Sequence, residues 1–102
     1  MSSENFKVTT TADETRIQVR GMLDVNTAPT LAEAVDELMA KRPARVLVDL
    51  TALDIIDSSG VAVLVKLYKG IRAQGGQVQI TGARDQPLAI FKLLRMDKVF
   101  AL

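Results

Sequence analysis

Apolar and polar residues alternate singly between Thr15 and Arg20, as expected for a strand with one buried face. Ile17 and Val19 are the apolar members of this alternation, and we expect both to point inward. The stretch Phe6–Thr10 is also rich in β-prone residues. The two stretches flank the polar tetrapeptide Thr11-Ala12-Asp13-Glu14, so the pattern predicts a β-hairpin.

Three later stretches have the three- and four-residue spacing of amphipathic helices. The first begins near Ala28-Pro29, with the Thr27 hydroxyl as its predicted cap, and ends at Lys41-Arg42-Pro43. The second covers Val61–Ala73, and the third begins near Gln86-Pro87. The expected inner faces are Leu31, Val35, Leu38 and Met39; then Val61, Leu64, Val65, Tyr68 and Ile71; then Leu88, Phe91 and Leu94.

Short apolar runs between these helices predict further strands. Arg45–Leu50 is rich in Val and Leu, which suits a strand covered on both faces. Val78–Thr81 predicts another strand and Val99-Phe100 a short last one, whereas Thr51–Ile56 is too irregular to assign. The order of elements predicts an α/β fold in a single domain over residues 1–102. We expect a mixed sheet of four to five strands, with about three helices packed on it and right-handed parallel connections.

Composition narrows the classes of function. The 102 residues are 48% hydrophobic and 25% charged, with a net charge of +1, which fits one globular domain. His and Cys are both absent, which removes thiol nucleophiles, disulfides, most zinc sites and any histidine general base. We therefore expect no enzymatic activity, no cofactor and no metal.

The same composition bears on partners and location. Three Phe, one Tyr and dispersed Lys and Arg residues argue against nucleic acid as a partner. The sequence has neither a basic start followed by an apolar core nor a run of 18 apolar residues. We therefore expect a cytoplasmic protein without direct membrane contact.

The stretch Asp57-Ser58-Ser59-Gly60 is the strongest candidate for a functional site. It joins an apolar strand region to the second helix and places a hydroxyl at or next to the N-cap, where unpaired amides favour anions. One reading is structural: Ser58 caps the helix with help from Asp57, and Gly60 lets the helix pack closely. The other is that Ser58 receives a group from another protein. Neither a G-x-S-x-G elbow nor a glycine-rich phosphate-binding loop is present.

Asp24 is a second candidate, in a strand-end loop that also precedes a helix. Such loops gather at one edge of an α/β sheet, so Asp24 could lie near Asp57 and Ser58. Its carboxylate either caps a turn before Asn26 and Thr27 or contacts a partner.

The chain resembles the STAS domains of the anti-sigma factor antagonist family over nearly its whole length. The resemblance rests on Gly21-Met22-Leu23-Asp24, Val48-Asp49-Leu50, Ile56-Asp57-Ser58-Ser59-Gly60-Val61, Leu64-Val65 and Gly75-Gly76, in that order. It implies that Ser58 is the phosphoacceptor. It also implies that an ATP-dependent anti-sigma serine kinase is both modifier and partner, and that a PP2C-type phosphatase reverses the mark. The unphosphorylated form would bind the kinase and free a sigma factor or another target.

We place the predicted partner contacts on Asp24, Asp57, Ser59 and Gly60. The chain departs from the family pattern at Met22, where relatives often have Glu. It departs again at Arg95-Met96, where relatives often have Gly-Leu, so we expect a different end to the third helix. Short STAS proteins also include the cytoplasmic subunits of lipid-transport ABC systems, which gives an alternative function.

Overall fold

The computed structural model describes residues 5–102, so residues 1–4 of the predicted domain lie outside the described range. In chain order the elements are β1 Phe6–Thr10, β2 Thr15–Val19, β3 Gly21–Leu23, α1 Ala28–Ala40, β4 Arg45–Asp49, β5 Leu53–Ile56, α2 Ser58–Ala73, β6 Gln77–Thr81, α3 Asp85–Leu93 and α4 Met96–Val99. Four strands form the main sheet in the order β1-β2-β4-β6. The pair β1 and β2 is antiparallel, and the other neighbours are parallel. The predicted hairpin and mixed α/β sheet are confirmed.

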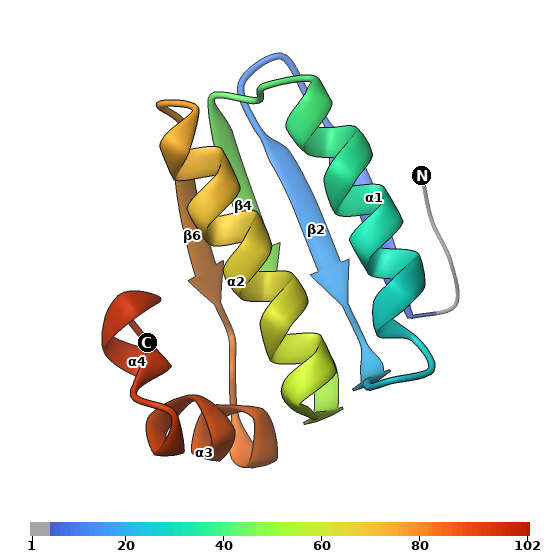
Figure 1. Cartoon of the computed structure of the whole chain (residues 1–102), viewed down its shortest axis with the longest axis vertical. Helices are drawn as coiled ribbons and strands as arrows, with labels where there is room; N and C mark the ends of the chain where they lie inside the picture. Colours follow the sequence, from blue (N-terminus) through green and yellow to red (C-terminus); the bar gives the residue numbers. More distant parts are fainter. Residues whose placement is uncertain (1–4) are drawn as a thin grey trace.

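Helices α1 and α2 lie side by side across one face of this sheet (Figure 1). The strands therefore alternate between a buried face and an open one. Ile17 and Val19 are buried as expected, and so are Val46 and Val48 in β4. Leu47, between them, is half-buried on the open face. The prediction that this strand is covered on both faces is wrong, because the helices cover only one.

β3 and β5 form a separate parallel pair beyond the end of the main sheet. Met22 lies opposite Ile55, and Leu23 lies opposite Ile56. The sequence left both segments unassigned as strands, because three or four residues are too few to show a period. Pairing over such a length depends on tertiary contacts rather than on local preference.

The end of the chain is helical, so the short strand predicted at Val99-Phe100 is wrong. Phe100 follows α4 and is buried, with its ring edge-on to the rings of Tyr68 and Phe91 at centroid distances of 5.3 and 5.5 Å. Aromatic packing thus fastens the C-terminal segment to α2 and α3.

Arg95 separates α3 from α4 and has a left-handed backbone, with φ of 59°. This is the conformation that glycine favours at the end of a helix. An arginine therefore adopts here the backbone conformation that glycine usually supplies after a helix. The turn directs Leu94 outward, 49% exposed, so its predicted place on the inner side of α3 is wrong.

Candidate partner-binding site at the start of helix α2

Asp57 is the N-cap of α2 and joins three segments at one point. Its Oδ1 accepts hydrogen bonds from the backbone N–H groups of Ser59 and Gly60, at 2.8 and 3.1 Å. Its Oδ2 accepts from the N–H of Val25 at 3.1 Å, and its own N–H donates to the carbonyl of Leu23 at 3.1 Å. The carboxylate therefore satisfies two unpaired amides of the helix and also links α2 to the loop after β3.

Ser58 is the first residue of α2, one position beyond the cap. The reading in which its hydroxyl caps the helix is therefore wrong, because Asp57 does so. Ser58 is exposed, and its hydroxyl has no hydrogen-bond partner among residues 5–102. The hydroxyl is thus accessible, and it stands at the positive end of a sixteen-residue helix, where added negative charge is favoured.

Gly60 sets how closely the helix approaches the β3–β5 pair. A Cβ at Gly60 would lie 2.6 Å from the carbonyl oxygen of Leu23 and 2.8 Å from Cγ1 of Ile56. The predicted close packing at Gly60 is confirmed, since a larger residue cannot occupy this position without a shift. Gly60 is buried and Ser59 is half-buried, so Ser58 is the most exposed residue of the motif.

Asp24 is a turn cap in this structure. Its Oδ1 accepts hydrogen bonds from the N–H groups of Asn26 and Thr27, at 2.9 and 3.2 Å. The prediction that the Thr27 hydroxyl caps α1 is wrong. This hydroxyl instead donates to the carbonyl of Met22 at 2.8 Å. The bond between Val25 and Asp57 brings this loop beside the start of α2. The two strand-end loops therefore converge as expected, while a partner contact by Asp24 stays a prediction.

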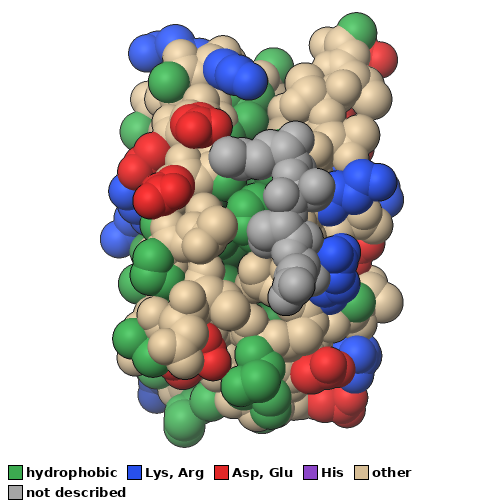
Figure 2. Space-filling model, turned by 90° about the vertical axis from the view of Figure 1, so that its right-hand side faces the viewer, with side chains coloured by type: hydrophobic (Ala, Val, Ile, Leu, Met, Phe, Trp, Pro, Cys, Tyr) green, Lys and Arg blue, Asp and Glu red, His purple; other side chains and the backbone are tan. Residues whose placement is uncertain are grey.

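Three exposed apolar side chains, Met22, Val25 and Ile55, are 52%, 65% and 41% exposed and form what we call the apolar rim. Met22 and Ile55 are opposite each other in the β3–β5 pair, and Val25 is tied to Asp57. Hydrophobic side chains gather at this end of the molecule, at the bottom of the view (Figure 2). Exposed apolar groups gathered in this way are typical of a protein interaction site.

Of the two adjacent residues Ile55 and Ile56, only Ile56 is buried in the core. A signal for the exposed isoleucine was present. Consecutive residues of a strand point to opposite faces, so an Ile-Ile pair at the edge of a fold sends one side chain outward. Recognising β5 as a strand would have predicted it.

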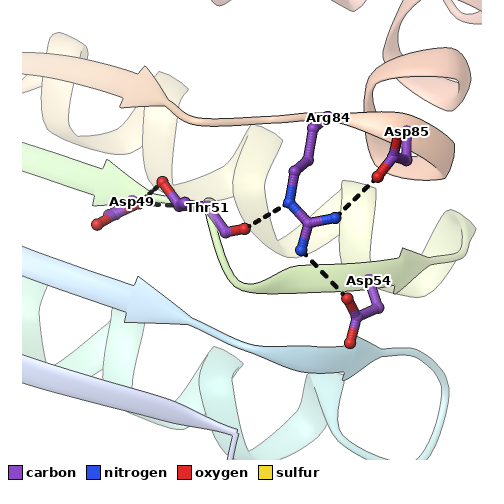
Figure 3. Close-up of polar contacts among 5 residues, drawn as sticks. All are labelled: Asp49, Thr51, Asp54, Arg84 and Asp85. Carbon is purple, nitrogen blue, oxygen red and sulfur yellow. Dashed lines mark hydrogen bonds and ion pairs between the residues drawn. The ribbon is translucent and has the colours of Figure 1, made fainter.

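Arg84 fastens the start of α3 to the segment that leads into β5 (Figure 3). Its Nε donates to the carbonyl of Thr51 at 2.7 Å, and its other nitrogens pair with Asp85 at 2.8 Å and Asp54 at 3.3 Å. Hydrogen bonds to Asp85 and then to Asp54 raise the pKa of Arg84. Nearby, the Thr51 hydroxyl and N–H donate to Asp49 at 2.6 and 2.9 Å and lower the pKa of that carboxyl.

Within residues 5–102, no group of three or more Asp and Glu side chains is arranged to hold a metal ion. In the same part of the chain, none of the helices combines the length and the apolar character that crossing a membrane requires.

A family model described as "Mlab, STAS domain" matches residues 6–102, nearly all of the chain. The chain belongs to the STAS domain family. The resemblance found in the sequence is thereby confirmed, and the separate β3–β5 pair and the exposed Ser58 are features of this STAS domain.

Known proteins similar to this STAS domain include several anti-sigma factor antagonists. The anti-sigma-B factor antagonist of Listeria monocytogenes is 27% identical over 90 residues, which are 88% of this chain and 79% of the relative. The solved anti-sigma factor antagonist of Mycobacterium paratuberculosis superposes with a TM-score of 0.84 at 23% identity, covering 98% of this chain and 87% of its own. The Bacillus cell fate determinant SpoIIAA in its phosphorylated form gives a TM-score of 0.76 at 16% identity, covering 91% and 86%. At these identities the two structures establish the shared fold.

Proposed function

We propose that this STAS domain is an anti-sigma factor antagonist that is switched by phosphorylation at Ser58. The observation that carries the proposal is a free, exposed hydroxyl at the first turn of α2, next to the apolar rim. The similarity to an anti-sigma-B factor antagonist supports the class of partner, an anti-sigma factor. We propose that this partner is an ATP-dependent serine kinase in the cytoplasm and that it docks on the rim.

Binding and modification oppose each other in this mechanism. Docking removes water from Met22, Val25 and Ile55, which favours association because apolar area is buried. Phosphorylation adds about −1.5 to −2 charges beside that area. A dianion at Ser58 must be desolvated on docking, and Asp57 is the neighbouring carboxylate, so the partner is released. Within the free domain the same dianion is stabilised by the positive end of α2.

The kinase and a PP2C-type phosphatase supply the chemistry, and we propose no catalysis by the STAS domain itself. In the forward step the Ser58 oxygen bonds to the γ-phosphorus of ATP, the bond from that phosphorus to the bridging oxygen breaks, and ADP leaves. The hydroxyl proton passes to a base of the kinase. In the reverse step water cleaves the phosphoserine, releasing inorganic phosphate and restoring the hydroxyl.

Substitutions at Ser58 separate this switch from a structural role. Ser58→Ala should keep the apolar rim neutral, bind the kinase like wild type and resist modification. Ser58→Asp should stay folded, with the dipole of α2 contributing roughly 0.3–1 kcal/mol to stability, but should bind at least tenfold more weakly. Ser59→Ala removes the neighbouring, half-buried hydroxyl and should still be modified at Ser58, so it separates the acceptor from its neighbour; weaker binding by this variant would support the predicted partner contact of Ser59. Thermal melts, titrations against the kinase and intact mass after incubation with ATP measure these effects. Tight binding by Ser58→Asp together with loss of binding by Ser58→Ala would refute the switch.

The alternative, a subunit of a lipid-transport ABC system, differs in its partner. A pull-down with this STAS domain from its host should recover an ATP-binding serine kinase. Recovery of a nucleotide-binding transporter subunit, with Ser58 never modified, would favour the alternative.

A further inference from the structure

Gln86, the second residue of α3, binds the backbone of β5 immediately before the Ser58 motif. Its Nε2 donates to the carbonyl of Ile56 at 2.9 Å, and its Oε1 accepts from the N–H of the same residue at 2.9 Å. One side-chain amide thus satisfies both backbone hydrogen-bonding groups of Ile56. Only Asp57 stands between that residue and Ser58.

The neighbouring strand position is bonded in the opposite direction. The N–H of Asp57 donates to the carbonyl of Leu23 in β3, at 3.1 Å. Successive residues of a strand direct their backbone groups to opposite edges, so β5 is held by β3 on one edge and by Gln86 on the other. The carboxamide takes the place that a third strand would have.

Arg84 provides a second tie between the same two elements, near the beginning of β5 (Figure 3). This tie is exposed to solvent, whereas the two hydrogen bonds of Gln86 are partly buried. Partly buried hydrogen bonds constrain a backbone more strongly than exposed ion pairs, which water and salt screen. Gln86 is therefore the stronger of these two polar restraints on this edge of β5.

We propose that Gln86 is a positioning residue for phosphorylation of Ser58. By holding both backbone groups of Ile56, it fixes the segment from which Asp57 caps α2 and from which Ser58 projects. Phosphoryl transfer depends on how well the acceptor oxygen is placed, so loss of this restraint slows transfer without removing any group that touches the kinase. The inference rests on the proposed function, in which Ser58 is the acceptor.

The test compares Gln86→Met with Gln74→Met. Gln74 is also half-buried and donates through Nε2 to a backbone carbonyl, that of Met39 at 2.9 Å, but it lies at the far end of α2. Gln86→Met removes two hydrogen bonds to the backbone, whereas Gln74→Met removes one together with a buried Oε1 that has no partner within residues 5–102. Gln86→Met should therefore lower the melting temperature more than Gln74→Met. Only Gln86→Met should lower kcat/KM for phosphorylation of Ser58 by the host's anti-sigma serine kinase with Mg-ATP, by about tenfold. Equal values for the two variants would overturn the inference.

Amide hydrogen exchange of the isolated protein gives a readout that needs no kinase. Gln86→Met should speed exchange at the N–H groups of Asp57, Ser59 and Gly60 more than Gln74→Met does, and unchanged exchange there would overturn the inference. Gln86→Glu keeps the size and one of the two hydrogen bonds, so it serves if Gln86→Met does not fold. If the kinase leaves the wild type unmodified, the proposed function fails, and exchange alone decides whether Gln86 holds this segment.

Discussion

The main sheet and the β3–β5 pair are stabilised in different ways: the main sheet carries the hydrophobic core under α1 and α2, and the β3–β5 pair carries the proposed binding site. Four strands of the main sheet form a continuous backbone ladder under α1 and α2, with side chains such as Val48 and Ile71 fully buried. The β3–β5 pair has only three and four residues per strand. An isolated pair of strands is marginal in water, so this one depends on what surrounds it.

In the β3–β5 pair and the loops around it, hydrogen bonds from single polar side chains hold the backbone in place. Asp57 joins α2 to the loop after β3, Asp24 caps that loop, and Gln86 holds the outer edge of β5. The proposed site is built on this region rather than on the main sheet. Substitutions of single polar residues around the β3–β5 pair should consequently change partner binding and local order there. The main sheet should stay ordered in these variants.

The largest effect is expected where the two regions touch. Gly60→Ala places a methyl group 2.6 Å from the carbonyl oxygen of Leu23, which is backbone and cannot turn aside. Overpacking of this kind costs about 1–3 kcal/mol, measured as the free energy of unfolding in urea.

Gly70→Ala is the matched control, with the same change in the same helix. Its added methyl group meets the flexible thioether of Met39 instead of backbone. The gain in helix propensity, roughly 1 kcal/mol, offsets that contact. Equal stability of the two variants would show that α2 can shift freely over β3, and would contradict the close fit of Gly60 against the β3 backbone.

A smaller effect on stability, but a clearer local one, is expected at Asp57. Asp57→Ala removes the cap and the link to Val25, at a cost of about 0.5–2 kcal/mol. Exchange of the amides in β3, β5 and the first turn of α2 should become faster, while that of β4 stays slow.

Asp57→Asn is the informative companion. Its carbonyl oxygen can still accept from Ser59 and Gly60, but an amide nitrogen cannot accept from the N–H of Val25. Faster exchange confined to the Val25 loop would identify the link between α2 and this loop. Uniformly faster exchange in both regions would mean that they unfold as one unit.

The sequence predicted the main sheet better than the β3–β5 pair. Alternation around Ile17 and the helical spacing of α2 predicted the main sheet and its cover, because many residues repeat one pattern. The β3–β5 pair was missed because its strands are too short for a period. Ser58 was found from the strand-to-helix boundary, but the choice of Asp57 as cap depends on backbone angles that adjacent Asp and Ser residues do not determine. Gln86 was recognised only as part of a helix start, and its contact with Ile56 was missed because the two residues are thirty positions apart in the sequence.

The smallest expected effect lies at Thr51, in the turn that leads from the main sheet to β5. The Thr51 hydroxyl is the main cause of the lowered pKa of Asp49, whose ordinary value is 3.8. A carboxyl with a pKa lowered by folding stabilises the folded state above its unfolded pKa, and this contribution is lost as the pH falls through the folded pKa. Thr51→Val should therefore destabilise the protein at pH 7, and the difference from wild type should shrink in the pH range below 3.8.

Solvent screening limits the size of that difference, because Asp49 is only partly buried. We expect less than about 1 kcal/mol at pH 7, from urea unfolding of wild type and Thr51→Val at neutral and acidic pH. Thr51→Ser keeps the hydroxyl and should behave like wild type at both. The hydrogen bond from Arg84 to Thr51 should persist in both variants, because it is made to the Thr51 backbone and not to the side chain. A loss of stability in Thr51→Val that is the same at both pH values would show that the hydrogen bond to Asp49 is not what stabilises this turn. A loss of stability in Thr51→Ser, which lacks the methyl group, would assign the effect to that methyl group.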